Sequence, residues 1–65
     1  MNSCLTEREQ TVLEFLPTML KAREIAADLD VSVNTVKAHL RSLHRKLEVG
    51  TRREAVEKAR ARGLL

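Results

Sequence analysis

The sequence predicts an all-α domain of four helices with a helix-turn-helix, and three observations support this prediction. The 43% apolar content comes almost wholly from Leu, Val and Ala, and Phe15 is the single aromatic residue. Leu and Ala favour helices, whereas strand-rich domains favour aromatic and β-branched residues. Capping signals divide the chain into four segments, and the third segment has apolar residues at helical spacing. A chain of 65 residues can form only one small domain, which we place at 1–65.

The first two predicted helices are short. Thr6 and Glu9 match a capping box, so the first helix should begin there, and it should end before Pro17. The second helix is expected over residues 21–29, and the three residues that follow it should break it. Residues 1–4, in contrast, are expected to be disordered or added by cloning.

The third predicted helix, over about residues 32–47, has two contrasting sides. Ser32 is a suitable N-cap, and apolar side chains then recur at three- and four-residue steps and face a core. No acidic residue occurs between Asn34 and Leu47. The opposite side therefore suits a polyanion, and a helical wheel places on it Asn34, Lys37, Ala38, Arg41, Ser42 and Arg45.

A fourth helix is expected after Gly50, which should act as a flexible junction. Thr51 and Glu54 form a further capping box at its start, and Gly63 should stop it. Two helices of about ten residues, a tight joint and a longer cationic helix make a helix-turn-helix, whose second helix lies in the major groove of DNA.

Charge changes sign along the chain. Residues 1–33 carry six acids and three bases, residues 34–50 carry one acid and four bases, and residues 51–65 carry two acids and five bases. Such asymmetry orients a molecule in the field of a polyanion. No segment approaches the roughly 20 apolar residues of a membrane span, so no membrane partner is expected. The lone Cys4 allows no internal disulfide, and a cytoplasmic location is the default expectation.

No catalytic pattern is found in the sequence. It lacks a Gly-rich phosphate loop, a nucleophile motif and a metal-binding His-Glu pattern. His39 and His44 are five positions apart, which rotates them by about 140° on an ideal helix, so they would not easily share a metal ion. We therefore expect no enzyme activity, no cofactor and no metal site.

Several blocks of residues, at the correct spacing, resemble the LuxR-type helix-turn-helix domain. They are Leu5-Thr-Glu-Arg-Glu9, Glu24-Ile-Ala26, Val33-Asn-Thr-Val-Lys-Ala-His-Leu40, Arg45-Lys-Leu47 and Arg53-Glu-Ala-Val56. The resemblance covers essentially residues 5–65 and implies the DNA-binding end of a bacterial transcription regulator. The segment Leu16-Pro-Thr-Met-Leu20 most resembles the corresponding segment in the group of such regulators that have a large ATP-binding module.

The resemblance also implies which residues contact double-stranded DNA. The family's base-reading and backbone-binding positions correspond to Asn34, Thr35, Lys37, Ala38, Arg41 and Arg45. It further implies that two copies pair on DNA through the fourth helix, at Ala55 and Ala59. Because such a patch is too small for a stable dimer, we expect the isolated domain to be monomeric. RNA polymerase is a further candidate partner.

The chain departs from the family pattern before the second helix. Where the family often has Gly and then Ser or Thr followed by Asn, this chain has Met19, Lys21 and Ala22. A hydroxyl that could cap the second helix is missing, and Lys21 or Arg23 could supply charge for a phosphate instead. In the joint after the third helix, Glu48 and Gly50 replace the common Gly and Ser.

Two alternative functions remain open from the sequence. A promoter-recognition domain of a sigma factor can have a very similar first helix, although the block from Asn34 to Leu40 favours the LuxR interpretation. The second alternative is a helical protein-interaction module whose cationic face binds an acidic partner. Binding to DNA and binding to an acidic protein both depend on salt concentration, so a salt titration would not separate them. Competition by unrelated duplex DNA against a selected site would separate them.

Overall fold

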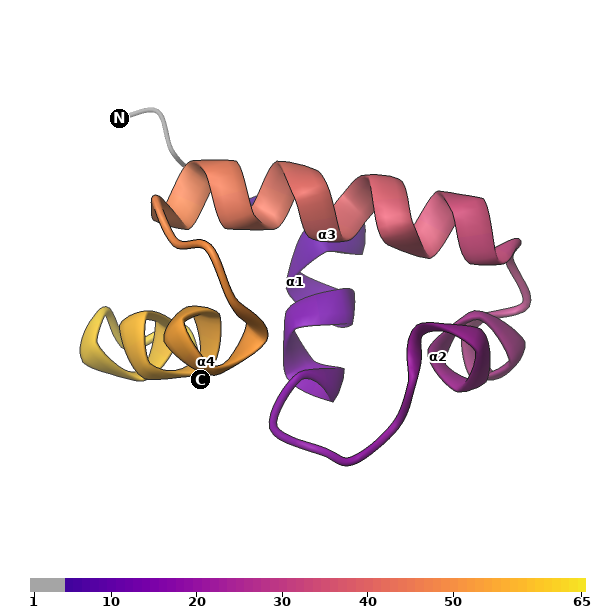
Figure 1. The fold of residues 1–65 in the computed structure, drawn as a ribbon, viewed down its shortest axis with the longest axis horizontal. Helices are drawn as coiled ribbons and strands as arrows, with labels where there is room; N and C mark the ends of the chain where they lie inside the picture. The colour runs from indigo at the N-terminus through magenta and orange to yellow at the C-terminus, as the bar shows by residue number, and fades with distance from the viewer. Residues whose placement is uncertain (1–4) are drawn as a thin grey trace.

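The computed structural model describes residues 5–65, and within this range it contains four α-helices and no strand. Helix α3 runs along one edge of the molecule, and the other three helices all lie on the same side of it (Figure 1). The all-α prediction is thereby confirmed, whereas the expectation for residues 1–4 lies outside the described residues. The helices are α1 (Glu7–Phe15), α2 (Ala22–Leu29), α3 (Val33–Leu47) and α4 (Arg52–Ala61).

Side-chain caps begin three of the four helices where the sequence predicted them. At α1 the Thr6 hydroxyl accepts from the Glu9 N–H (3.1 Å), and the Glu9 carboxylate accepts from the Thr6 N–H (2.9 Å). Thr51 and Glu54 form the same reciprocal pair at α4 (3.1 and 3.2 Å). Ser32 caps α3 through its hydroxyl. These bonds satisfy backbone N–H groups that have no acceptor within the helix.

Helix α2 begins differently, because its N-cap is Lys21, which has no side-chain oxygen. The Lys21 N–H donates to Oε1 of Glu24 (2.7 Å), and no side chain at the N-cap returns a bond. Half of the usual capping box is therefore present, in agreement with the missing hydroxyl noted in the sequence.

Helices α2 and α3 end at residues in the left-handed conformation, and neither residue is glycine. Asp30 has a φ of 58° and Glu48 a φ of 59°. The left-handed turn after α3 falls on Glu48, whereas Gly50, which we expected to be a flexible junction, does not have a positive φ. Gly63 does, with a φ of 74°, and it follows the end of α4 as predicted.

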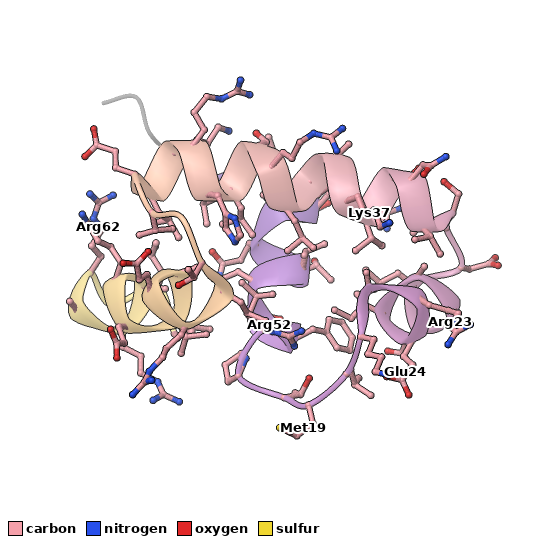
Figure 2. All side chains as sticks on the ribbon, in the orientation of Figure 1. Met19, Arg23, Glu24, Lys37, Arg52 and Arg62 are labelled. Carbon is pink, nitrogen blue, oxygen red and sulfur yellow. The ribbon has the colours of Figure 1, made fainter. Side chains whose placement is uncertain are left out.

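Arg52 at the start of α4 caps the C-terminal end of α1 (Figure 2). Its guanidinium donates to the carbonyl oxygens of Leu16 (2.9 Å), Phe15 (3.2 Å) and Thr18 (2.9 Å). The last carbonyls of a helix have no donor within the helix, so a guanidinium placed there satisfies them and favours the negative end of the helix dipole. Arg52 therefore fixes both α4 and the loop after α1.

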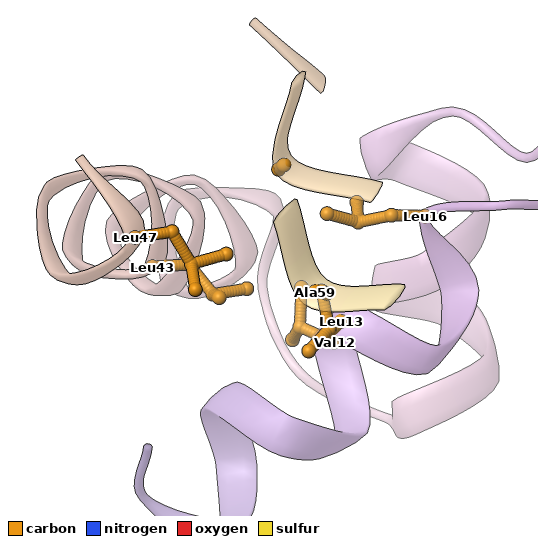
Figure 3. Close-up of a cluster of buried hydrophobic side chains, with 7 residues drawn as sticks. Val12, Leu13, Leu16, Leu43, Leu47 and Ala59 are labelled. Carbon is orange, nitrogen blue, oxygen red and sulfur yellow. The ribbon is translucent and has the colours of Figure 1, made fainter. Parts of the chain in front are cut away.

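The hydrophobic core has two parts that share α3. The larger part joins α1, α3 and α4 (Figure 3), and the smaller part packs α2 on the first half of α3. Leu29 and Leu40 contact both parts. Helix α3 is thus packed along one side, which leaves its other side to solvent. The larger part contains Val12, Leu13, Leu16, Leu43, Leu47, Ala55 and Ala59, and the smaller contains Ile25, Ala26 and Val36.

The prediction that Ala55 and Ala59 form a dimer contact is wrong. Both residues are completely buried and pack in the larger part of the core. Their small side chains allow α4 to approach α1 and α3 closely, because a larger residue would need space that a close-packed interior does not have. A second molecule cannot reach them while the domain is folded.

Candidate nucleic-acid interface

The side of α3 that points away from the core is polar and cationic. We call it the outer face of α3, and it is formed by Asn34, Lys37, Ala38, Arg41 and Arg45, all of which are exposed. Among residues 5–65, no acceptor pairs with the side chain of Lys37, Arg41 or Arg45. The predicted exposure of these five residues is confirmed, and the three cations face solvent without a partner in the described part of the chain.

Thr35 occupies the margin of this face and is half-buried. Its hydroxyl shares a hydrogen bond with the Ser32 hydroxyl (2.8 Å), and its N–H donates to the same Ser32 oxygen (3.1 Å). Thr35 thus stabilises the first turn of α3, next to the position of Asn34. Since a helix begins with unpaired N–H groups, this turn also presents positive partial charge at the end of the outer face.

Ser42 does not lie on the outer face, so the helical-wheel assignment of this residue is wrong. It is half-buried, and its hydroxyl donates to Oε2 of Glu9 on α1. Helix α1 packs against this flank of α3, which the wheel of a single helix could not show. Ser42 therefore joins two helices.

Lys46 also faces α1 rather than solvent. Its ammonium lies 2.7 Å from Oε1 of Glu9, whose side chain is only 5% exposed. Burial raises the pKa of Glu9, but hydrogen bonds from Lys46, Ser42 and the Thr6 N–H outweigh this effect and lower the pKa to about 2. Glu9 is therefore ionised inside the α1–α3 contact. Sequence analysis explained Glu9 by capping alone and missed this second role.

The two histidines of α3 belong to its inner margins. His39 and His44 are both half-buried, and Nε2 of His44 is buried without a hydrogen-bond partner among residues 5–65. Within this same range, no group of three or more His, Cys, Asp or Glu side chains is placed to hold a metal ion. None of the described helices combines the length and apolar character needed to cross a membrane.

Helices α2 and α3 and the short turn between them form a helix-turn-helix. At 1.5 Å per residue, the 15 residues of α3 extend about 22 Å, and the outer face follows this whole length. Its side chains are of the types that read DNA: Lys and Arg donate to guanine O6 and N7, Asn pairs with adenine, and cations contact phosphates.

A profile of the family described as "Bacterial regulatory proteins, luxR family" matches residues 3–59. The chain belongs to this family. It is 46% identical over 61 residues to the transcriptional regulatory protein YdfI of Bacillus subtilis. The aligned residues make up 94% of this chain and 29% of YdfI. It is 42% identical over 57 residues to the HTH-type transcriptional regulator MalT of Vibrio cholerae and 44% identical over 57 residues to MalT of Yersinia pestis.

These matches cover 88% of the chain but only 6% of either MalT protein, so the chain corresponds to a small part of these relatives. No solved structure gave a significant match. The predicted LuxR-type family is confirmed, and the helix-turn-helix fold agrees with it. Family membership supports DNA-binding transcription regulation as the general role, and the sigma-factor alternative gains no support from the matched family.

Proposed function

We propose that this domain binds double-stranded DNA in a sequence-specific manner, with α3 in the major groove, and that it serves in bacterial transcription regulation. The supporting observation is the outer face of α3, where Lys37, Arg41 and Arg45 are exposed and have no acceptor within residues 5–65. On a helix face that is only exposed to solvent and binds no partner, we would expect acidic residues one turn from the cations. Helix α3 contains none.

The position of each outer-face residue along α3 would determine which part of the DNA it contacts. Lys37 and Arg41 lie one turn apart in its middle and would contact base edges, with Asn34 and Ala38 beside them. Arg45 lies in the last turn and would contact a phosphate. Thr35, whose hydroxyl is bonded to Ser32, would keep the entering turn in place.

The domain would act as a non-enzymatic, cytoplasmic regulator without a cofactor. A contact with RNA polymerase and membership of the group with a large ATP-binding module stay predictions. The remaining alternative, a helical module that binds an acidic protein, would use the same cations but would not discriminate between DNA sequences.

Titration of the domain with a duplex selected from random sequences, and with a scrambled duplex, tests the proposal. We expect tighter binding to the selected duplex, and each phosphate contact should add about 0.9 to the slope of log affinity against log salt. Equal affinity for both duplexes would exclude sequence readout. Unrelated duplex DNA that displaced the selected duplex equally well would favour the protein-interaction module.

Substitutions on α3 test which residues read bases. Lys37→Ala and Arg41→Ala should each weaken binding to the selected duplex by about 1–3 kcal/mol and relax the preference at individual bases. Arg45→Ala should weaken binding to all duplexes alike. The control is Arg8→Ala, an exposed cation on α1. If Lys37→Ala and Arg41→Ala left the selected sequence unchanged, the assignment of the base-reading residues would be wrong.

We also propose that two copies bind adjacent half-sites and that the free domain is monomeric. Since Ala55 and Ala59 are buried, any contact through α4 would use exposed residues such as Ala61. DNA holds two bound copies at high effective concentration, so a weak contact suffices for cooperativity. Ala61→Glu should preserve binding to one half-site and reduce cooperativity on two, and sedimentation would test the state of the free domain. Unchanged cooperativity would contradict a contact at this position.

A further inference from the structure

A second distinctive surface lies between α4 and the loop that follows α1. We call it the Met19 groove. It is on the side of the molecule away from α3, as the position of Met19 shows (Figure 2). A partner bound there would leave the outer face of α3 accessible. The groove residues used in the argument are Pro17, Met19, Arg53, Val56, Glu57 and Arg60.

The apolar part of the groove is held in place by hydrogen bonds. Met19 is 95% exposed, and the other large exposed hydrophobic residue of the described chain, Leu65, is 40% exposed. The residues on both sides of Met19 are tied down: the Thr18 carbonyl accepts from Arg52 (2.9 Å), and the Leu20 N–H donates to the Thr18 hydroxyl (3.2 Å). The exposure of Met19 thus belongs to a bonded loop, and a partner would meet this side chain already presented.

The walls of the groove carry an excess of positive charge. Arg53 and Arg60 are exposed, and the acidic residue that lines the groove is Glu57. Glu57 lies 3.7 Å from Arg53, with side chains 68% and 90% exposed, so the pair is solvated and easily exchanged. Within residues 5–65, no acceptor pairs with Arg60. Methionine and arginine are both enriched in protein–protein interfaces, and Met adapts its shape to different apolar partners.

We propose that the Met19 groove docks an acidic amphipathic segment of another protein. Apolar side chains of that segment would cover Met19, Pro17 and Val56, while its carboxylates would pair with Arg53 and Arg60. The apolar centre distinguishes this surface from the outer face of α3, where the chemistry is that of a phosphate or base-edge contact. The proposal goes beyond DNA binding and does not depend on it, since the two surfaces are separate.

Titration of the ¹⁵N-labelled chain with a designed peptide, followed by NMR, tests the proposal. The peptide places Leu at helical spacing and Asp or Glu at the remaining positions. A control peptide has the same composition in an order that breaks the apolar stripe. Each titration is run on the free domain and on the domain saturated with duplex DNA. The expected result is saturable shifts at residues 17–19 and 53–60 in both states, with about tenfold weaker binding of the control peptide.

Substitutions separate the apolar and charged contributions. Met19→Ser and Arg60→Glu should each weaken the designed peptide by about tenfold and leave the fold intact, since both side chains are exposed. The matched controls are Leu65→Ser and Arg8→Glu, which are exposed residues outside the groove and should change affinity less than about twofold.

Three outcomes would overturn the proposal. Shifts confined to α3 and abolished by duplex DNA would show that the peptide only imitates a polyanion. Equal binding of both peptides would exclude the apolar contact. Groove shifts that appear on raising the concentration of the domain alone would identify a second copy of this chain as the occupant. A failure of DNA binding, in contrast, would be seen in the duplex titration. The peptide titration of the free domain would still test the Met19 groove in that case.

Discussion

Helices α3 and α4 are both rich in basic residues, yet their positive charges have different surroundings. On α3, Lys37 and Arg41 project into solvent without an acceptor in the described chain. On α4, the guanidinium of Arg52 is bonded to three carbonyl oxygens near the end of α1, and Arg53 lies beside Glu57. The same contrast occurs within α3 between exposed Arg45 and Lys46, which pairs with Glu9.

This difference shows that the number of cations does not define a nucleic-acid surface. The sequence alone does not separate two interpretations of the arginines on α4, which could form a phosphate-binding patch or simply a solvated face. Arg52 belongs to neither, because using it for a phosphate would break the bonds that hold the end of α1. A binding face requires cations whose donors are not already satisfied within the fold.

The largest expected effect comes from placing the same acid on each helix. Ala59→Glu should unfold the domain, because an unpaired carboxylate in the core costs about 5 kcal/mol or more, comparable to the whole stability of a small domain. Ala38→Glu, on the outer face of α3, should keep the fold and weaken duplex binding at least about tenfold through repulsion by phosphates. Circular dichroism and duplex titration would measure the two effects. A folded Ala59→Glu variant would contradict the burial of this residue.

The ion pair between α1 and α3 predicts a specific pH dependence. The pKa of Glu9 is lowered from 4.5 to about 2, so the unfolded chain binds a proton first as the pH falls. The stabilisation is complete above about pH 4.5 and is lost as the pH falls through about 2, for a total of about 3 kcal/mol. Urea unfolding at several pH values would show this loss in the wild type and its absence in Glu9→Gln.

Glu14→Gln, on an exposed position of α1, is the matched control for Glu9→Gln. Equal pH dependence in the wild type and in Glu9→Gln would show that the Glu9–Lys46–Ser42 contact does not stabilise the domain. In that case the α1–α3 junction would depend on apolar packing alone.

The arginines at the start of α4 should differ in their effect on stability. Arg52→Ala removes three hydrogen bonds from a charged donor and should lower the free energy of unfolding by about 2 kcal/mol. Arg52→Lys should not restore it, because an ammonium lacks the planar fork that reaches several carbonyls. Arg53→Ala should change stability by less than about 0.5 kcal/mol. Similar losses in Arg52→Ala and Arg53→Ala, measured by urea unfolding, would refute the capping role.

The smallest expected effect concerns the joint between α3 and α4. Glu48→Gly should stabilise the domain by about 1 kcal/mol, since glycine adopts the left-handed conformation without the cost of a side chain. Gly50→Ala should change stability by less than about 0.5 kcal/mol, because a methyl group there would lie 3.7 Å from the nearest neighbouring atom, Oε1 of Glu54. Thermal unfolding would compare the two variants. Destabilisation by Glu48→Gly would contradict the strain assigned to this residue.

The helices and the outer face of α3 were predictable from the sequence because they depend on near neighbours. The caps at Thr6, Ser32 and Thr51 join residues three positions apart, and apolar residues at three- and four-residue steps identify the packed side of a helix. The absence of acids from α3 is likewise a property of consecutive residues. Local rules also indicated a break after α3, although they pointed to Gly50, whereas the residue in the left-handed conformation is Glu48.

Only the tertiary structure decided which polar residues form hydrogen bonds or ion pairs within the domain. Glu9 meets Ser42 and Lys46 across 33 and 37 positions, and Arg52 meets the Leu16 carbonyl across 36 positions. The burial of Ala59 likewise depends on the packing of α4 against α1 and α3. A single helix shows the direction of each side chain around its own axis, whereas the neighbour in that direction is determined by how the helices pack together.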